Sequence, residues 1–302
     1  DEFPLKSERG EIPNFKCFGY YGGMPKLNLK NPEVEKFITD VACYWIRECD
    51  IDGWRMDVGD EISHFFWKNF RKAVKAVKKD MLIIGEIWHY AGDFLEGDEW
   101  DTVMNYPFYL NMIDLLADEK ITVSQFIQNL GYLKGRLNKK CYPLMWNLID
   151  SHDTARFLHL CKNNKKKQHL AAAFQLLLPG MPMIYYGDEY AMPGANDPDC
   201  RRGMYWDEEY QDKEMFEWYK QLLQVRKKYK CIVEGELIEA ITGDEEETIV
   251  LIRKNSEETM ALIFNCSSSE KRFNEYEGKY NLLGEELFDG KVEGLDAAVI
   301  VL

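Results

Sequence analysis

Three acidic residues of this sequence each follow a short apolar run of the kind that forms a buried β-strand. Asp57 closes the run GWRMD, and Arg55, two residues earlier, would project from the same face of that strand. Glu86 follows LIIG, and Asp153 lies just beyond LMWNLID, next to His152. A single such residue could be half of a buried ion pair, but parallel-strand barrels gather their chemistry at the carboxyl ends of the strands. We therefore expect the three carboxylates to share one site.

Converging carboxylates beside arginine, histidine and tryptophan indicate glycoside hydrolysis. The sequence has neither a metal-ligand cluster nor a glycine-rich phosphate loop that would indicate another chemistry. One carboxylate attacks the anomeric carbon or activates water, and another, with a raised pKa, protonates the leaving oxygen. Trp88 and His89 directly follow the run that ends in Glu86 and Ile87, and they could contact sugar rings. Packing within a loop is the alternative for both side chains.

Strand and helix signals alternate over most of the chain. A helix is predicted from Pro32, because Asn31 is a good N-cap and apolar residues recur at helical spacing after it. A second helix is predicted from about Glu61, capped by Asp60. Strand-like runs are IDGWRMDV, MLIIGEIW, TVMNY, LMWNLID and MPMIYYG, and those that are apolar on both faces favour a parallel sheet. After Tyr229, short β-rich runs separated by polar turns predict an antiparallel sheet.

Composition argues against several other classes of protein. Lys plus Arg total 38 against 52 for Asp plus Glu, and the net charge of −14 repels nucleic-acid phosphates and anionic membrane surfaces. No apolar run is long enough to span a membrane, and the start DEFPLKSERGE lacks signal-peptide features. The eight cysteines are scattered, which favours reduced thiols and provides no zinc-ligand spacing. We expect a cytoplasmic protein that binds neither nucleic acid nor membrane and has no metal or cofactor of its own.

Several motifs carry a specific resemblance. The segments GWRMD, GEIWH and SHD, in this order and with these gaps, resemble the second, third and fourth signature regions of the α-amylase family of retaining glycoside hydrolases. The segment MPKLN at 24–28 resembles an extra signature of the neopullulanase and cyclomaltodextrinase branch, as do YYGDE at 185–189 and DPDCRRGMYWD at 197–207. The resemblance covers essentially the whole chain.

The resemblance implies a role for each matching residue. Asp57 would be the nucleophile, Glu86 the general acid/base, and Asp153 the third carboxylate, which orients the distorted sugar. The residues expected to bind substrate are Arg55, which would hold Asp57 ionised, His152 on the same glucose unit, Trp88 and His89 on the leaving-group sugars, and Asp197 and Arg201 on the next sugar on the other side. The two carboxyl groups of a retaining enzyme should lie about 5 to 5.5 Å apart.

The resemblance also implies a TIM barrel followed by a small all-β domain C. Counting from the run that carries Asp57 gives five strand-like runs rather than eight, and the first signature of the family is missing. The expected fold is therefore α/β, the C-terminal five βα units of a (β/α)8 barrel with domain C. Its domains would be 1–30, a remnant of the excursion between barrel strands three and four; 31–230, the partial catalytic barrel; and 231–302, the all-β domain C.

The expected lack of the first three barrel strands also leads to expectations about binding partners. The expected substrate is an α-glucan or maltooligosaccharide. Open strand edges predict a homo-oligomer or an association with the missing N-terminal piece. Calcium could be bound only through residues of that missing piece. The isolated chain would then be inactive. The alternative is a catalytically inactive fragment or a barrel-type carbohydrate-binding or partner protein.

Overall fold

The computed structural model describes residues 15–302. The segment DEFPLKSERGE and the rest of the first fourteen residues of the predicted 1–30 domain lie outside the described residues. The chain forms two compact units, one made of Asp1–Ile87 with Asp93–Asp101 and the other of Trp88–Gly92 with Thr102–Leu302. Within the described range, no helix has both the length and the apolar character needed to cross a membrane.

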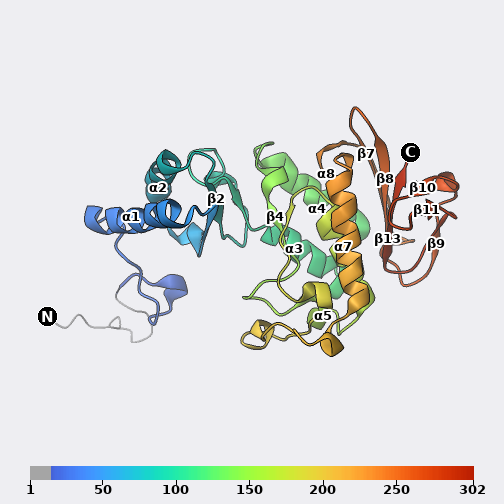
Figure 1. Cartoon of the computed structure of the whole chain (residues 1–302), viewed down its shortest axis with the longest axis horizontal. Helices are drawn as coiled ribbons and strands as arrows, with labels where there is room; N and C mark the ends of the chain where they lie inside the picture. Colours follow the sequence, from blue (N-terminus) through green and yellow to red (C-terminus); the bar gives the residue numbers. More distant parts are fainter. Residues whose placement is uncertain (1–14) are drawn as a thin grey trace. The chain divides into compact units, whose positions relative to one another are not determined.

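The first unit is built around two parallel strands and two helices that lie side by side (Figure 1). The strands pair in register from Gly53 with Leu82 to Met56 with Gly85, which confirms two of the predicted strand runs as neighbours. The elements of this unit are η1 (Phe18–Tyr20), α1 (Pro32–Cys49), β1 (Gly53–Met56), η2 (Gly59–Glu61), α2 (His64–Val77) and β2 (Leu82–Gly85).

Capping explains where the two helices begin. Helix α1 starts at Pro32 as predicted, and the side chain of Asn31 accepts a hydrogen bond from the backbone N–H of Glu33. The predicted start of α2 at Glu61 is wrong. A 3-10 turn occupies Gly59–Glu61, and the helix begins only at His64, where Ser63 caps the backbone N–H of Phe66. Ser63 rather than Asp60 is therefore the N-cap.

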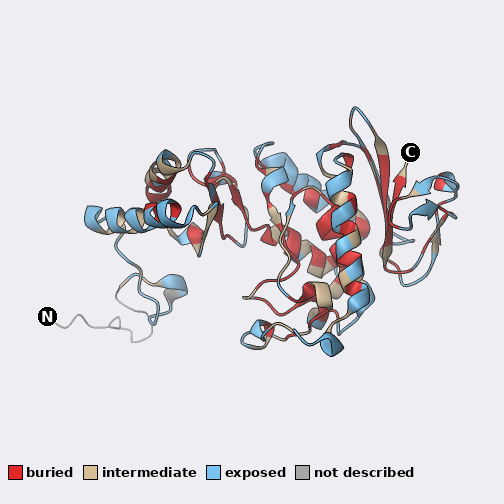
Figure 2. Ribbon diagram, viewed as in Figure 1, coloured by how far each residue is buried: buried red, intermediate tan, exposed pale blue. Residues whose placement is uncertain are grey.

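Helix α1 leaves much of its apolar side in contact with solvent. It buries Ala42, Cys43 and Ile46, whereas Phe37 is 64% exposed and Trp45 is 45% exposed. Most of the helix accordingly appears as exposed in Figure 2. Burying an aromatic side chain of this size is worth about 1.5 to 3 kcal/mol, so this face is suited to a further packing partner.

The larger part of the second unit continues the strand and helix alternation. Strands β4 and β5 are parallel, with Trp146 opposite Met181 and Asn147 opposite Pro182. Together with β1, β2 and β3 they place one strand in each of the five predicted strand runs. The elements are β3 (Thr102–Val103), α3 (Tyr106–Met112), the π-helical η4 (Ile113–Ala117), α4 (Val123–Arg136), η5 (Tyr142–Leu144), β4 (Trp146–Asn147), α5 (Phe157–Leu160), α6 (Lys165–Leu177), β5 (Met181–Pro182), η6 (Asp188–Tyr190), η7 (Asp199–Arg201), η8 (Glu208–Tyr210), α7 (Lys213–Lys228) and α8 (Cys231–Glu234).

The C-terminal part of the second unit is an antiparallel sheet, as the sequence predicts. Its strand order is β11-β10-β13-β8-β7-β6, and the central strands β7, β8 and β13 are largely buried. Helix α6 packs against β13 and contributes many side chains to the hydrophobic core, among them Leu170 and Phe174, which are fully buried. The strands of this sheet are β6 (Glu236–Gly243), β7 (Thr248–Lys254), β8 (Thr259–Asn265), β10 (Tyr280–Asn281), β11 (Glu286–Leu287) and β13 (Asp296–Val301). Strands β9 (Lys271–Arg272) and β12 (Lys291–Val292) pair with each other in a separate two-stranded sheet.

Candidate active site

The first unit brings two of the predicted carboxylates to neighbouring strand ends. Because Met56 of β1 lies opposite Gly85 of β2, Asp57 and Glu86 each stand one residue beyond the last paired position. The backbone N–H of Glu86 still donates to the carbonyl of Met56 at 3.0 Å, so the ladder holds Glu86 in place. The strand register alone therefore sets these two acids side by side at the carboxyl edge.

A single guanidinium connects the two carboxylates. Nη2 of Arg55 lies 2.9 Å from Oε1 of Glu86, and Nη1 forms an ion pair with Oδ1 of Asp57. Arg55 is on β1 itself, two residues before Asp57, which explains why its side chain reaches that face. The predicted contact of Arg55 with Asp57 is present, and the contact with Glu86 adds to it.

The surroundings of the two carboxylates differ. Glu86 is only 5% exposed, and its Oε2 accepts a hydrogen bond of 2.8 Å from the backbone N–H of Val58. The side chain of Asp57 is 74% exposed. Two acids in unlike environments are the usual basis for two different catalytic roles. Here Asp57 is open to solvent, whereas Glu86 is held by the backbone N–H of Val58 and by Arg55.

The position of the Trp100 ring explains why two residues near this pair are glycines. A Cβ on Gly85 would come within 2.2 Å of the Trp100 ring, and a Cβ on Gly59 within 2.7 Å of it. The indole is itself buried, stacked on Phe94 with ring centroids 4.1 Å apart. Glycine at both positions therefore lets the ring support the strand end that carries Glu86.

The second unit brings together another four of the predicted residues. Oδ2 of Asp153 lies 3.1 Å from Nε2 of His152, and Oδ1 of Asp153 lies 3.0 Å from Nη2 of Arg201. Nε of Arg201 is in turn 2.9 Å from Oδ1 of Asp197. Residues far apart in the sequence thus form one connected set of polar contacts, with the Asp153 side chain 30% exposed at its centre.

Trp88 and His89 follow Glu86 in the chain but belong to the second unit. The Trp88 indole stacks on Tyr106, with ring centroids 4.1 Å apart, and the Tyr106 hydroxyl donates to Oγ of Ser151 at 3.3 Å. Trp88 is thereby tied to the segment that carries Asp153, while still 41% exposed. His89 is exposed as well, and its Nδ1 lies 3.3 Å from the carbonyl oxygen of Tyr90.

Sequence analysis did not identify a buried polar cluster beneath Asp153. Nη1 of Arg156 lies 3.1 Å from Oδ1 of Asp188, and both side chains are fully buried. Asp150 lies beside Asp188, and its Oδ1 accepts from the backbone N–H of Phe157 at 2.5 Å. The sequence places Asp150 at the end of LMWNLID and Arg156 in the polar segment that follows it, but nothing in it indicates that they meet Asp188.

We infer that the neighbouring carboxyls of Asp150 and Asp188 share a proton. Burial raises the pKa of Asp188 to about 7, and burial together with the charge of Asp188 raises the pKa of Asp150 well above its usual range. Oδ2 of each carboxylate would otherwise have no hydrogen-bond donor among the described residues. A proton held between the two carboxyl groups would supply the donor that they lack.

This shared proton makes stability depend on pH. The pKa of Asp188 is higher in the folded than in the unfolded chain, so the folded state keeps a proton that the unfolded state releases above about pH 4. The free energy of unfolding should fall as pH rises above about 4, and the fall should continue to at least about pH 7, because the pKa values of both carboxyls are raised in the folded chain. Asp150→Asn can donate its amide to Asp188 without titrating, so urea unfolding at pH 5 and pH 8 should show a smaller fall. The exposed control Asp80→Asn should leave the pH slope unchanged, and an equal slope in Asp150→Asn would contradict the shared proton.

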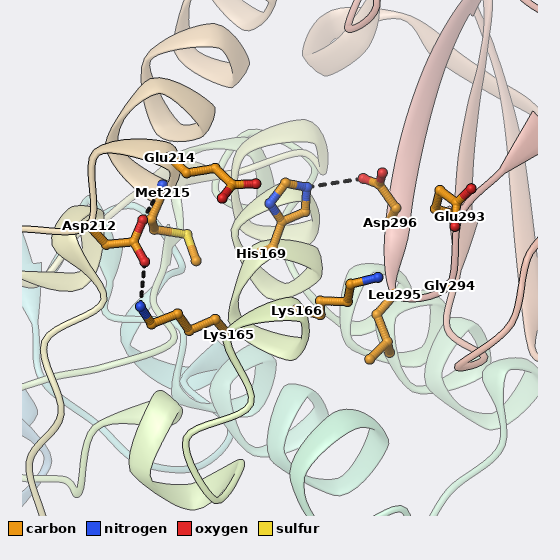
Figure 3. A pocket seen from close by; sticks show the side chains of 10 residues that line it. All are labelled: Lys165, Lys166, His169, Asp212, Glu214, Met215, Glu293, Gly294, Leu295 and Asp296. Carbon is orange, nitrogen blue, oxygen red and sulfur yellow. Dashed lines mark hydrogen bonds and ion pairs between the residues drawn. The ribbon is translucent and has the colours of Figure 1, made fainter.

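A separate cavity of about 380 Å³ lies between α6, the start of α7 and the loop before β13 (Figure 3). Its charged side chains have both signs and largely pair with one another, for example Lys165 with Asp212 at 2.7 Å and His169 with Asp296 at 3.0 Å. No residue predicted for the active site lines it. Across residues 15–302 there is also no group of three or more His, Cys, Asp or Glu side chains that could hold a metal ion.

The chain matches one protein family and is similar to several known proteins. The family model described as alpha amylase, catalytic domain, matches residues 13–235. A cyclomaltodextrinase from Geobacillus thermopakistaniensis (strain MAS1) is 43% identical over 299 residues, which are 97% of this chain and 50% of that protein. An intracellular maltogenic amylase from Bacillus subtilis is 43% identical over 266 residues, 88% of this chain and 45% of that protein. The solved structure of a cyclomaltodextrinase superposes with a TM-score of 0.91 at 33% identity, covering 98% of this chain and 53% of the other. The chain thus spans about half the length of the relatives it matches.

Proposed function

The chain belongs to the α-amylase family, and on that premise we propose that it carries the catalytic residues of a retaining glycoside hydrolase that cleaves α-1,4-glucosidic bonds. The observation that carries the proposal is the pair Asp57 and Glu86 at adjacent strand ends, bridged by Arg55. Carboxylates at the carboxyl ends of parallel strands are where barrel enzymes perform their chemistry.

The proposed reaction uses the two carboxylates in turn. A carboxylate oxygen of Asp57 bonds to the anomeric carbon while the glycosidic C–O bond breaks, and Glu86 gives its proton to the departing oxygen. Glu86, now ionised, then takes a proton from a water molecule whose oxygen attacks the same carbon and releases Asp57. The guanidinium of Arg55 contacts both acids and holds their carboxyl groups next to each other.

Asp153 completes the site in this proposal. Its pairing with His152 and Arg201 presents a charged, hydrogen-bonding cluster suited to sugar hydroxyls. Trp88 offers a half-exposed aromatic face of the kind that stacks on sugar rings. We propose that both groups line one sugar pocket, in a barrel of which this chain supplies five of the strands.

The rest of the barrel would cover surfaces that are open here. Among the described strands β1 pairs only with β2, and α1 exposes Phe37 and Trp45. We propose that the remaining strands of the barrel, or otherwise a second copy of the chain, pack on this edge and face. Catalysis would then need that partner, and the 302 residues alone would be inactive.

The proposed substrates are cyclodextrins, pullulan or short maltooligosaccharides, in an enzyme that works inside the cell. The motif MPKLN supports the substrate class, and the relative named an intracellular maltogenic amylase supports the location. A barrel-type binding or partner protein remains the alternative. Retention of all three carboxylates, two of them bridged by one arginine, favours the enzyme.

The test is an assay of the longest natural form of the protein on cyclodextrin, pullulan and soluble starch, with the isolated 302 residues measured in parallel. We expect activity of the longer form on at least one of the three substrates, and none from the isolated chain. Proton NMR of the first products should show the α-anomer before mutarotation, because a double displacement retains configuration. Inactivity on all three substrates would contradict the proposed function, and an initial β-anomer would contradict retention.

A further inference from the structure

Two segments of the second unit carry the residues around Asp153. The first, 150–156, follows β4 and contains His152 and Asp153. The second, 187–201, follows β5 and contains Asp197 and Arg201. Apart from the short turns η6 and η7, neither segment has regular secondary structure. Their mutual position must therefore come from side chains and from hydrogen bonds between the segments.

Arg156 makes two bonds from the first segment to the second. Its backbone N–H donates to the carbonyl of Gly194 at 2.9 Å, and its Nη1 donates to Oδ1 of Asp188 at 3.1 Å. The guanidinium carbon also lies 4.5 Å from the ring centroid of Tyr185 and 5.0 Å from that of Tyr186. The whole side chain is 0% exposed, so it is inaccessible to a sugar.

Asp188, the partner of Arg156, is itself fixed to a rigid element. Its backbone carbonyl accepts a hydrogen bond of 2.8 Å from Nε2 of Gln168, which lies on the buried helix α6. Removing one member of a buried ion pair leaves the other charge without compensation, so the pair acts as a unit. The first segment is thus anchored through Arg156 and Asp188 to α6.

The second segment is also tightly packed against the first next to Arg201. The thiol of Cys200 donates to the carbonyl of His152 at 3.4 Å, and the hydroxyl of Tyr185 donates to the carbonyl of Cys200 at 3.2 Å. At Gly194 there is no spare room, since a Cβ there would lie 2.9 Å from the Cα of Cys200 and 3.2 Å from Cδ of Arg156. A shift of the Arg156 side chain would consequently displace Cys200 and its neighbour Arg201.

We propose that Arg156, acting through Asp188, is a positioning residue that holds Asp153 and Arg201 at the distance needed for catalysis. The role assigned to Asp153 rests on the proposed function; the anchoring of the two segments does not. Arg156 touches no substrate. It acts only by fixing the position of the Asp153 carboxylate relative to the Arg201 guanidinium.

Arg156→Lys tests this positioning in the longest natural form of the protein. Lysine keeps the positive charge but lacks the planar fork that lies against the two tyrosine rings while bonding Asp188. We expect kcat on maltotriose to fall about 10- to 100-fold at a temperature well below the Tm, with KM changed less than about threefold, because an error near 1 Å can lower a rate by about 10². Asp188→Asn should behave alike, and the double variant should be no worse than the more impaired single variant.

Arg253→Lys is the matched control. Arg253 is another buried arginine, on β7, and it donates to the backbone carbonyls of Cys231, Val233 and Gly235 without contacting the active-site segments. Its replacement should lower the Tm and leave kcat unchanged below the Tm. If Arg156→Lys lowers the Tm in the same way and leaves kcat unchanged, Arg156 is merely structural and the positioning role is wrong.

Hydrogen–deuterium exchange gives a readout independent of activity. In Arg156→Lys and Asp188→Asn the amides of residues 151–155 should exchange faster, whereas in Arg253→Lys they should not. Unchanged exchange would overturn the positioning role even in an active enzyme, and faster exchange in a protein that hydrolyses no glucan would overturn the proposed function alone. Failure of both variants to fold, with Arg253→Lys folded, would also overturn the positioning role in favour of a purely structural one.

Discussion

Asp57→Asn should abolish turnover, lowering kcat on maltotriose or cyclodextrin by more than about 10⁴-fold, beyond the usual effect of losing one general acid. Asp57 stands at the exposed end of β1, and its carboxylate is the group that would bond to the anomeric carbon. Asparagine has nearly the same shape but cannot form the ester linkage to the sugar. The measurement is kcat in the longest natural form of the protein, with calorimetry on acarbose to show that the pocket still binds.

Asp52→Asn offers a control at the opposite end of the same strand. Asp52 precedes β1, is almost fully exposed and pairs with Lys78 at 2.9 Å. Exposed ion pairs of this kind contribute about 0 to 1 kcal/mol to stability, and the amino ends of barrel strands are not where catalysis occurs. Asp52→Asn should keep kcat within about twofold. If Asp57→Asn keeps more than about one hundredth of the wild-type kcat, Asp57 is not the nucleophile, since general-acid effects alone reach about 10².

The positions of the two strand-end acids could be predicted because the signals are local. Short apolar runs mark β1 and β2, and parallel strands end at the same edge, so Asp57 and Glu86 become neighbours once the strands pair. Once the two strands pair in this register, no long-range contact is needed to place the two acids together. The same logic placed Asp153 after β4 but did not reveal what holds it there.

The parts that could not be predicted depend on contacts between distant residues. Asp60 and Ser63 are both good N-caps, and the choice between them is made by the turn before α2. There Val58 adopts φ 49°, unusual for a β-branched residue, while its N–H donates to Glu86. Arg156 and Asp188 are likewise 32 residues apart, and nothing local to either indicates the pair. Side chains whose roles depend on such long-range bonds are found only in the folded chain.

The apolar side of α1 shows a third limit. Helical spacing places Phe37 and Trp45 on a face that should be buried, yet both are exposed in the structure, and the core of this unit takes Ala42 and Ile46 instead. Helical periodicity predicts which face of a helix is apolar, but it does not identify what that face packs against. Exposed aromatic residues on a regular helix therefore identify the surface that the proposed partner would cover.

Glu86→Gln should lower kcat by about 10²-fold or more on maltooligosaccharides, whose sugar leaving groups need a proton. Glutamine can still accept the hydrogen bond from Val58 through its amide oxygen, so the strand end should keep its shape while the transferable proton is lost. With a nitrophenyl maltoside, whose leaving group needs little protonation, the first step should be far less impaired. The loss should therefore depend on the leaving group, which a general loss of folding would not produce.

Glu99→Gln separates this effect from simple removal of a buried acid. Glu99 belongs to the same unit, is 2% exposed, and accepts a hydrogen bond from Nδ1 of His64 at 2.9 Å, away from the strand ends. Burial raises the pKa of Glu99, so its neutral replacement should be tolerated, with kcat within about threefold of wild type and no dependence on the leaving group. The decisive comparison is the ratio of kcat/KM on maltotriose to kcat/KM on the nitrophenyl maltoside, because kcat/KM reports the first step, whereas kcat also contains the second step, in which Glu86 acts as the base for both substrates. If Glu86→Gln and Glu99→Gln change that ratio equally, proton donation by Glu86 is ruled out, because only the proton donor senses the basicity of the leaving oxygen.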